Sequence, residues 1–184
     1  MKKFIFSLAI SMSLAVASQA QNTALCSSQT CKISFFSTTP VEDISAVSSR
    51  ALGVINIKTR EIAFSVDNPS FEFPNKLMQE HFNEKYMESE KYPKSTFKGK
   101  INEDVDLTKD GEYKVTVTGD LNVHGVEKKR TINGVIVVKN GTISIKSDFK
   151  VLVKDHNIEI PKLVVANIAE EIKVMIDAQL VAKK

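Results

Sequence analysis

Apolar and polar residues alternate along most of the chain after residue 31, which is typical of strands that bury one face. The clearest run spans residues 113–123, where the odd positions after Tyr113 are valine, glycine or leucine and the even positions are polar. Similar runs predict further strands at residues 33–38, 54–56, 62–66, 96–101, 131–138, 142–153 and 171–181. Asn140-Gly141 is a strong hairpin signal between two of them. Seven or eight hairpin-linked strands with one apolar face predict an all-β antiparallel barrel or sandwich.

One segment, from Pro74 to Met87, has the periodicity of a helix instead. Met78, Phe82 and Tyr86 follow one another at four-residue spacing, so they form an apolar stripe that faces inward. Pro74 stands where the first turn of a helix tolerates proline. We therefore expect a short helical insertion in the barrel, with Phe82 touching the interior.

The N-terminal segment has the pattern of a secretory signal peptide. Lys2 and Lys3 precede an apolar run over residues 4–16, and Ala20 is a small residue where a signal peptidase would cut. The run is shorter than the roughly 20 residues that span a bilayer, which disfavours the alternative of a retained anchor. The chain thus divides into a signal peptide at residues 1–20, a flexible leader at 21–31 and one barrel domain at 32–184. The expected location is periplasmic or secreted.

Charge and hydropathy argue against a nucleic-acid partner and against a membrane-spanning segment in the mature chain. The formal net charge is +3, and the basic residues are scattered among acidic ones, so the sequence predicts no nucleic-acid interface. After the signal peptide no stretch is long and apolar enough to span a bilayer, so we do not expect an integral membrane protein.

Two cysteines, Cys26 and Cys31, lie near the start of the expected mature chain. In an oxidising compartment they could form a disulfide or stay free, and spacing alone does not decide between these alternatives. Two thiolates without a neighbouring histidine make only half of a metal site, so no metal is predicted. Lipidation at Cys26 is disfavoured because bulky Leu25 precedes it.

Catalytic motifs are missing from the sequence, which contains no nucleophile elbow, zinc-protease helix, phosphate loop or dinucleotide fingerprint. We therefore predict no catalytic residues and no cofactor. Of the three histidines, His124 has the parity of the polar face and precedes Gly125, so it is expected to hold a turn at the barrel rim. A contact with the polar end of a ligand is the main alternative, and a metal ligand is a remoter one.

Several short motifs together resemble the YceI-like family. The motifs are His81-Phe82, Lys91-Tyr92-Pro93, Phe97, Gly99 and the run Gly119-Asp120-Leu121-Asn122-Val123-His124-Gly125. Their order and spacing match the family, and the resemblance covers about residues 32–180. It implies an extended lipocalin-like barrel of eight antiparallel strands with a helical insertion. It also implies that a polyisoprenoid chain binds inside the barrel, and it is compatible with a homodimer.

The leading hypothesis is therefore a carrier of an isoprenoid or another lipid-like molecule, and not an enzyme. The residues expected to contact the ligand are Phe82, Phe97, Val115, Val117, Leu121, Val123, Phe149, Val151, Ile172, Val174 and Ile176. A second hypothesis is a barrel filled by its own side chains that acts through its surface. Gly119 and Ala178 share the inward parity and are small, which favours a cavity. A third hypothesis is an enzyme that pairs His124 with Asp120 or Glu127.

Overall fold

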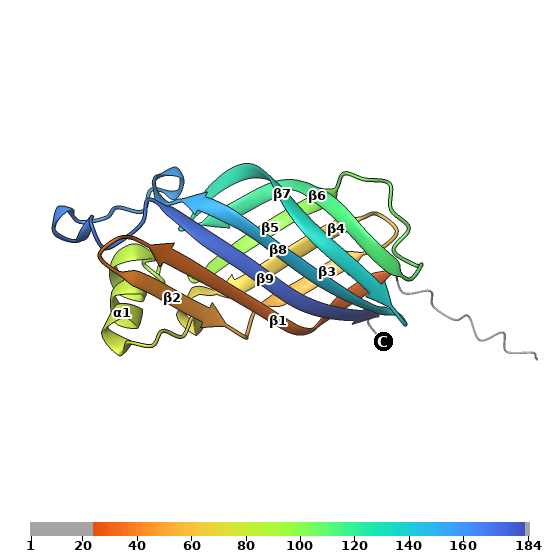
Figure 1. The fold of residues 1–184 in the computed structure, drawn as a ribbon, viewed down its shortest axis with the longest axis horizontal. Coiled ribbons are helices and arrows are strands. Elements are labelled where there is room, and N and C mark those ends of the chain that lie inside the picture. The colour runs from red at the N-terminus through yellow and green to blue at the C-terminus, as the bar shows by residue number, and fades with distance from the viewer. Residues whose placement is uncertain (1–23, 183–184) are drawn as a thin grey trace, which may run out of the picture.

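The computed structural model describes residues 24–182, which form one closed antiparallel sheet (Figure 1). The predicted signal peptide and residues 21–23 lie outside the described residues. The strands are β1 (Leu25–Thr38), β2 (Asp43–Ser48), β3 (Leu52–Asn56), β4 (Glu61–Asp67), β5 (Lys94–Ile101), β6 (Gly111–Val123), β7 (Val126–Lys139), β8 (Thr142–Leu152) and β9 (Glu171–Ala182). From β3 to β9 each strand pairs with the next, and β9 and β3 both pair with β1. Eight strands thus close the barrel, which confirms the predicted fold class.

Strand β1 differs most from the prediction, because residues 25–31 are its first half and not part of a flexible leader. This stretch is polar, so its side chains gave no strand signal. Its backbone is nevertheless paired on both edges, with β3 at Leu25–Ser27 and with β9 from Cys26 onward. The correction follows from these long-range hydrogen bonds, which depend on partners at the far end of the chain.

Strand β2 was also missed by the sequence patterns. It pairs with β1 over six residues, from Ile33↔Ser48 to Thr38↔Asp43, and lies at the edge of the sheet outside the closed barrel. Its sequence, Asp-Ile-Ser-Ala-Val-Ser, is short and Ser-rich, so it resembles a loop.

The predicted helix is confirmed as two consecutive pieces. Helix α1 (Lys76–His81) continues into a π-helical turn, η2 (Phe82–Tyr86). The Asn75 side chain caps α1 by accepting a hydrogen bond of 2.8 Å from the backbone N–H of Leu77. Short 3-10 turns add η1 (Asn68–Ser70), η3 (Val153–His156) and η4 (Lys162–Val164). Within residues 24–182, no helix has the length and hydrophobicity needed to cross a membrane.

Figure 1 shows that α1, the turn between β1 and β2, and the loop carrying η4 all lie at one end of the barrel. The other end is closed by packed side chains. Among the least exposed large residues are Ile55, Ile101, Ile136 and Leu180. The apolar core therefore fills one half of the barrel, and the three segments surround the other half.

Strands β5 and β6 approach each other unusually closely. Gly99 and Gly119 are direct cross-strand partners. A Cβ on Gly119 would press against the carbonyl oxygen of Lys98 and lie 2.5 Å from the Cα of Gly99. Glycine at position 119 therefore allows the backbones of β5 and β6 to approach closely. This corrects the expectation that the small residue helps to open a cavity.

Candidate functional site

The candidate site is an apolar cavity of about 410 Å³ in the half of the barrel next to α1. Its walls come from the inward faces of β1, β4, β5, β6, β8 and β9, and its end is bordered by α1, η2 and the η4 loop. A volume of this order lies in the range of small-molecule sites. Because the lining is largely aliphatic and aromatic, the cavity can solvate a hydrocarbon and offers few polar groups to orient a charged one.

Most of the predicted ligand-contact residues come together around this cavity. Nine of the eleven line it, namely Phe82, Phe97, Leu121, Val123, Phe149, Val151, Ile172, Val174 and Ile176. They lie on four strands and the π-helical turn, and barrel closure brings them together. Their contact with a ligand stays a prediction, but their shared position matches it.

Val115 and Val117 are placed differently. Both are buried, but neither borders the cavity. They stand opposite Gly134 and Ile132 of β7, in the half of the barrel that core side chains fill. Parity along β6 correctly gave their face, but it carries no information on how far along the barrel axis the interior stays hollow.

Four phenylalanine rings form a cluster at the α1 end of the cavity. The Phe35 ring centroid lies 5.2 Å from that of Phe71 and 5.4 Å from that of Phe82, and Phe73 lies 5.1 Å from Phe82. These separations are typical of stacked and edge-to-face aromatic contacts. Phe71 and Phe73 belong to the connection between η1 and α1, where no periodicity marks an inward face, so sequence patterns did not select them.

The loop between β8 and β9 also contributes lining that the sequence did not reveal. Ile160, Val164 and Ile168 border the cavity from this loop. Their four-residue spacing was a usable signal, but Pro161 and several turns interrupt the segment, so it did not resemble a helix. The mouth of the cavity is thus partly made by an irregular segment.

His124 holds a turn but lies inside the protein and not at an exposed rim. It follows β6 with a φ of 52°, and its side chain is buried. Nε2 lies 2.7 Å from a Glu88 carboxylate oxygen, and Nδ1 lies 3.1 Å from the His156 carbonyl oxygen. The Tyr92 ring packs edge-on against the imidazole, with 4.6 Å between the two ring centroids. His124 therefore joins three segments that surround the barrel end.

The carboxylate beside His124 is Glu88, and not the predicted Asp120 or Glu127. Glu88 lies in the loop after η2, 36 residues before His124, so no local spacing could reveal the pair. His124 is also absent from the cavity lining. The pair accordingly supports the ends of the barrel and does not face the apolar interior.

The carbonyl that Nδ1 of His124 meets belongs to a second buried histidine, His156. The Nδ1 of His156 lies 3.0 Å from the Val126 carbonyl oxygen, whereas its buried Nε2 has no hydrogen-bond partner. Burial lowers the pKa of His156, and the nearby Arg130 guanidinium acts in the same direction. The neutral imidazole is therefore the form that the fold accommodates.

Cys26 and Cys31 are both free and buried on β1. The two cysteines are five positions apart along the strand, so their Cα atoms are about 16 Å apart, which is far beyond the reach of a disulfide. Burial, and then the charge of Asp177, raise the pKa of Cys31 to about 11. Of the alternatives that the sequence left open, the structure thus selects separate core thiols.

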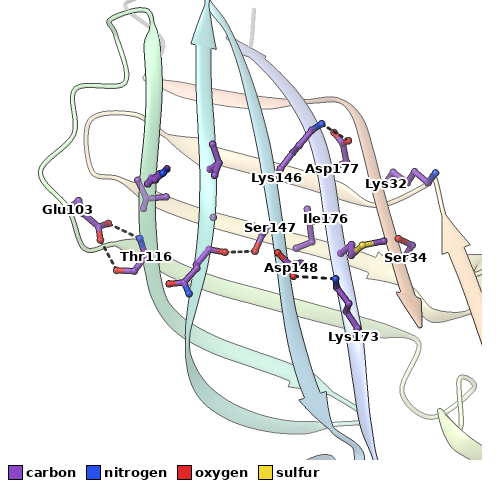
Figure 2. Close-up of a pocket in the computed structure, with 16 residues that line it drawn as sticks. Lys32, Ser34, Glu103, Thr116, Lys146, Ser147, Asp148, Lys173, Ile176 and Asp177 are labelled. Atoms are coloured by element: carbon purple, nitrogen blue, oxygen red, sulfur yellow. Dashed lines mark hydrogen bonds and ion pairs between the residues drawn. The ribbon is translucent and has the colours of Figure 1, made fainter. Parts of the chain in front are cut away.

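A second depression, of about 760 Å³, crosses the outer surface of β1 and β6–β9 (Figure 2). Its side chains are mostly polar, with Lys146 3.7 Å from Asp177 and Lys173 3.4 Å from Asp148. Both ion pairs are exposed, and such pairs contribute little binding or stability. This groove does not fit an apolar chain, so the inner cavity is the better candidate site.

The groove lies where two strands separate. Strands β7 and β8 pair only between Val135↔Lys146 and Lys139↔Thr142. Farther along, side chains bridge them: Ser147 Oγ donates to the Asn133 carbonyl oxygen at 2.6 Å, and Arg130 donates to the Lys150 carbonyl oxygen at 2.8 Å. The polar contacts in Figure 2 therefore belong to the structure of the barrel wall.

Solved structures of bacterial proteins share this fold. A Burkholderia cenocepacia protein, BcnA, superposes with a TM-score of 0.70 at 15% identity, covering 81% of this chain and 95% of its own. A polyisoprenoid-binding domain from Saccharophagus degradans, implicated in plant cell wall breakdown, gives 0.73 at 15% identity, covering 86% and 98%. The Campylobacter jejuni YceI protein gives 0.57 at 16% identity over the full length of both chains.

No curated protein sequence matches the chain. The sequence profile of the YceI-like domain, however, matches residues 19–180, which is nearly the entire chain. The match includes every strand of the barrel except the last two residues of β9. The protein therefore belongs to the YceI-like domain family.

Proposed function

We propose that the protein binds a long apolar molecule, a polyisoprenoid or a similar lipid chain, inside the barrel, in the periplasm or outside the cell. The observation that carries this proposal is the apolar cavity of about 410 Å³ in a barrel that is otherwise filled. An unfilled apolar interior costs stability, since its lining loses packing contacts. Binding of a hydrocarbon restores these contacts and removes apolar surface from water.

The comparisons support the class of ligand. The Saccharophagus degradans relative is a polyisoprenoid-binding domain, and its fold superposes on most of this chain. An isoprenoid tail offers no hydrogen-bond partners, so a site for it needs shape and apolar surface. The signal-peptide pattern of residues 1–20 supports export. The mostly apolar lining of the cavity supports a binding role and not a catalytic one.

The direct test is native mass spectrometry of the protein purified from a bacterial host, followed by organic extraction. We expect an adduct whose extracted mass resolves into isoprene units. A bare chain that also fails to take up an added isoprenoid quinone would contradict the proposal. That result would favour a protein that acts through its surface.

A matched pair of variants locates the ligand. Leu121 is buried in the cavity wall opposite Phe97, whereas its neighbour Asn122 has the opposite parity. We expect Leu121→Arg to abolish retention of the ligand and Asn122→Arg to keep it. Because a buried arginine can disrupt folding, Val174→Trp provides a second test that fills the cavity without adding charge. Retention of ligand by a folded Val174→Trp protein would place the ligand elsewhere.

A further inference from the structure

The cavity end of the barrel carries large aliphatic side chains that face solvent. Leu163 is 97% exposed, Val41 64%, Leu77 56% and Val165 53%. They come from three separate segments: the turn between β1 and β2, helix α1 and the η4 loop. Single exposed aliphatic residues are common on protein surfaces, but a group gathered around one opening is not.

Contacts place these three segments around the same opening. Leu77 itself lines the cavity, and so do Glu42, next to Val41, and Val164, next to Leu163. The Glu42 carboxylate accepts a hydrogen bond of 2.9 Å from the Asn167 side chain, which joins the β1–β2 turn to the η4 loop. Figure 1 shows the three segments together at one end of the barrel. We call Val41, Leu77, Leu163 and Val165 the apolar rim.

The η4 loop has two apolar sides. Ile160, Val164 and Ile168 border the cavity, while Leu163 and Val165 are exposed to solvent. Apolar surface therefore continues from the cavity wall, over the loop, to the outside of the protein. A filled core needs only the inner side, so packing within the barrel does not explain the outer one.

The lysines beside the two rim leucines suit a phosphate-bearing surface. Both leucines of the apolar rim directly follow a lysine, as Lys76-Leu77 and Lys162-Leu163. Lys162 is the only charged residue between positions 160 and 169. Lysine next to an inserted leucine can extend its ammonium group to the lipid phosphates while its methylene groups stay in the apolar layer.

We propose that the apolar rim docks on the surface of a phospholipid bilayer, with the four aliphatic side chains in the boundary between headgroups and acyl chains. The cavity then opens directly toward the membrane, where long isoprenoids dissolve. This step rests on the proposed function, because it gives the ligand a path that avoids water. The bilayer contact itself depends only on the rim.

The test is co-sedimentation with vesicles of phosphatidylethanolamine and phosphatidylglycerol. All strands of the described barrel lie between residues 25 and 182, so a chain that starts at Gln21 keeps the fold and omits the apolar N-terminal run. We expect the parent to sediment with vesicles. We expect Leu77→Ser combined with Leu163→Ser to lower its partition coefficient by about ten-fold or more, as expected from the loss of two inserted leucines.

Leu52→Ser is the matched control. Leu52 is 64% exposed, lies on β3 and does not border the cavity. Its substitution should leave vesicle binding unchanged. A parent that stays in the supernatant would overturn the proposal, as would equal losses in the control and the rim variant. A parent dimer that the rim variant converts to monomers, without vesicle binding, would instead assign the rim to a second copy of the chain.

Ligand retention in detergent solution separates the two proposals. A rim variant that retains isoprenoid in detergent but does not bind vesicles supports docking in a functional carrier. A parent that binds vesicles but never retains an isoprenoid would leave the docking surface standing and refute the proposed ligand. Failure of the membrane-docking proposal and failure of the ligand proposal therefore give different experimental results.

Discussion

The Nε2 atom of His124 lies 2.7 Å from a carboxylate oxygen of Glu88, across 36 residues of sequence. Nδ1 of the same ring lies 3.1 Å from the His156 carbonyl oxygen, and the Tyr92 ring packs edge-on against the imidazole. Both ring nitrogens therefore lie within hydrogen-bonding distance of an oxygen atom. This histidine therefore connects the loop after η2, the β6–β7 turn and the η3 turn.

We expect His124→Ala to lower the free energy of unfolding by about 1–3 kcal/mol, because one buried hydrogen bond, one partly buried hydrogen bond and an aromatic contact are lost together. Urea unfolding of His124→Ala, Glu88→Gln and the double variant measures their coupling. A positive coupling energy supports the pair as a structural link. Additive effects would show that the contact contributes nothing of its own.

His156 makes stability depend on pH. Burial lowers its pKa in the folded state below the ordinary value of 6.5, so the unfolded chain binds the proton more readily. The contribution of this neutral histidine to stability is thus present above pH 6.5 and is lost as the pH falls below it. We expect the free energy of unfolding to decrease between pH 7 and pH 5. In His156→Gln this decrease should be smaller than in the parent, and an identical slope would contradict the assignment.

Gly119 should not tolerate a side chain. Its Cβ would collide with backbone atoms of Lys98 and Gly99, which cannot move without separating β5 from β6. We expect Gly119→Ala to destabilise the barrel by about 2 kcal/mol or more, in the range of overpacked cores. Gly134→Ala is the control, since its closest contact is the Lys146 carbonyl oxygen at 3.3 Å. Equal midpoints of thermal unfolding for the two variants would refute the close approach.

The thiols should react slowly in the folded protein. Cys31 is buried, and its pKa of about 11 leaves far less thiolate at pH 8 than an ordinary cysteine has. We expect its reaction with a chromogenic disulfide reagent to be roughly a hundred-fold slower than in denaturant. An added surface thiol, in Glu112→Cys, supplies a fast internal reference. Native thiols that react as quickly as this reference would show that β1 opens readily.

Periodicity in the sequence was sufficient for the central strands, because a strand with one buried face must alternate. The runs at 113–123 and 171–181 match β6 and β9 within a few residues. The inward faces were correct as well, and nine of the eleven predicted residues meet at one cavity. These features are local consequences of side-chain type, so one sequence determines them.

Three other features depend on partners that are distant in the chain. The polar residues 25–31 became strand because β3 and β9 pair with their backbone. The extent of the cavity was set by core packing at the opposite end, which left Val115 and Val117 outside it. The loop after η2 brings Glu88 to His124, and sequence spacing does not reveal this contact. Sequence alternation thus determined which side chains face inward, whereas barrel closure, through long-range pairing and packing, decided where the interior is hollow and which polar groups meet.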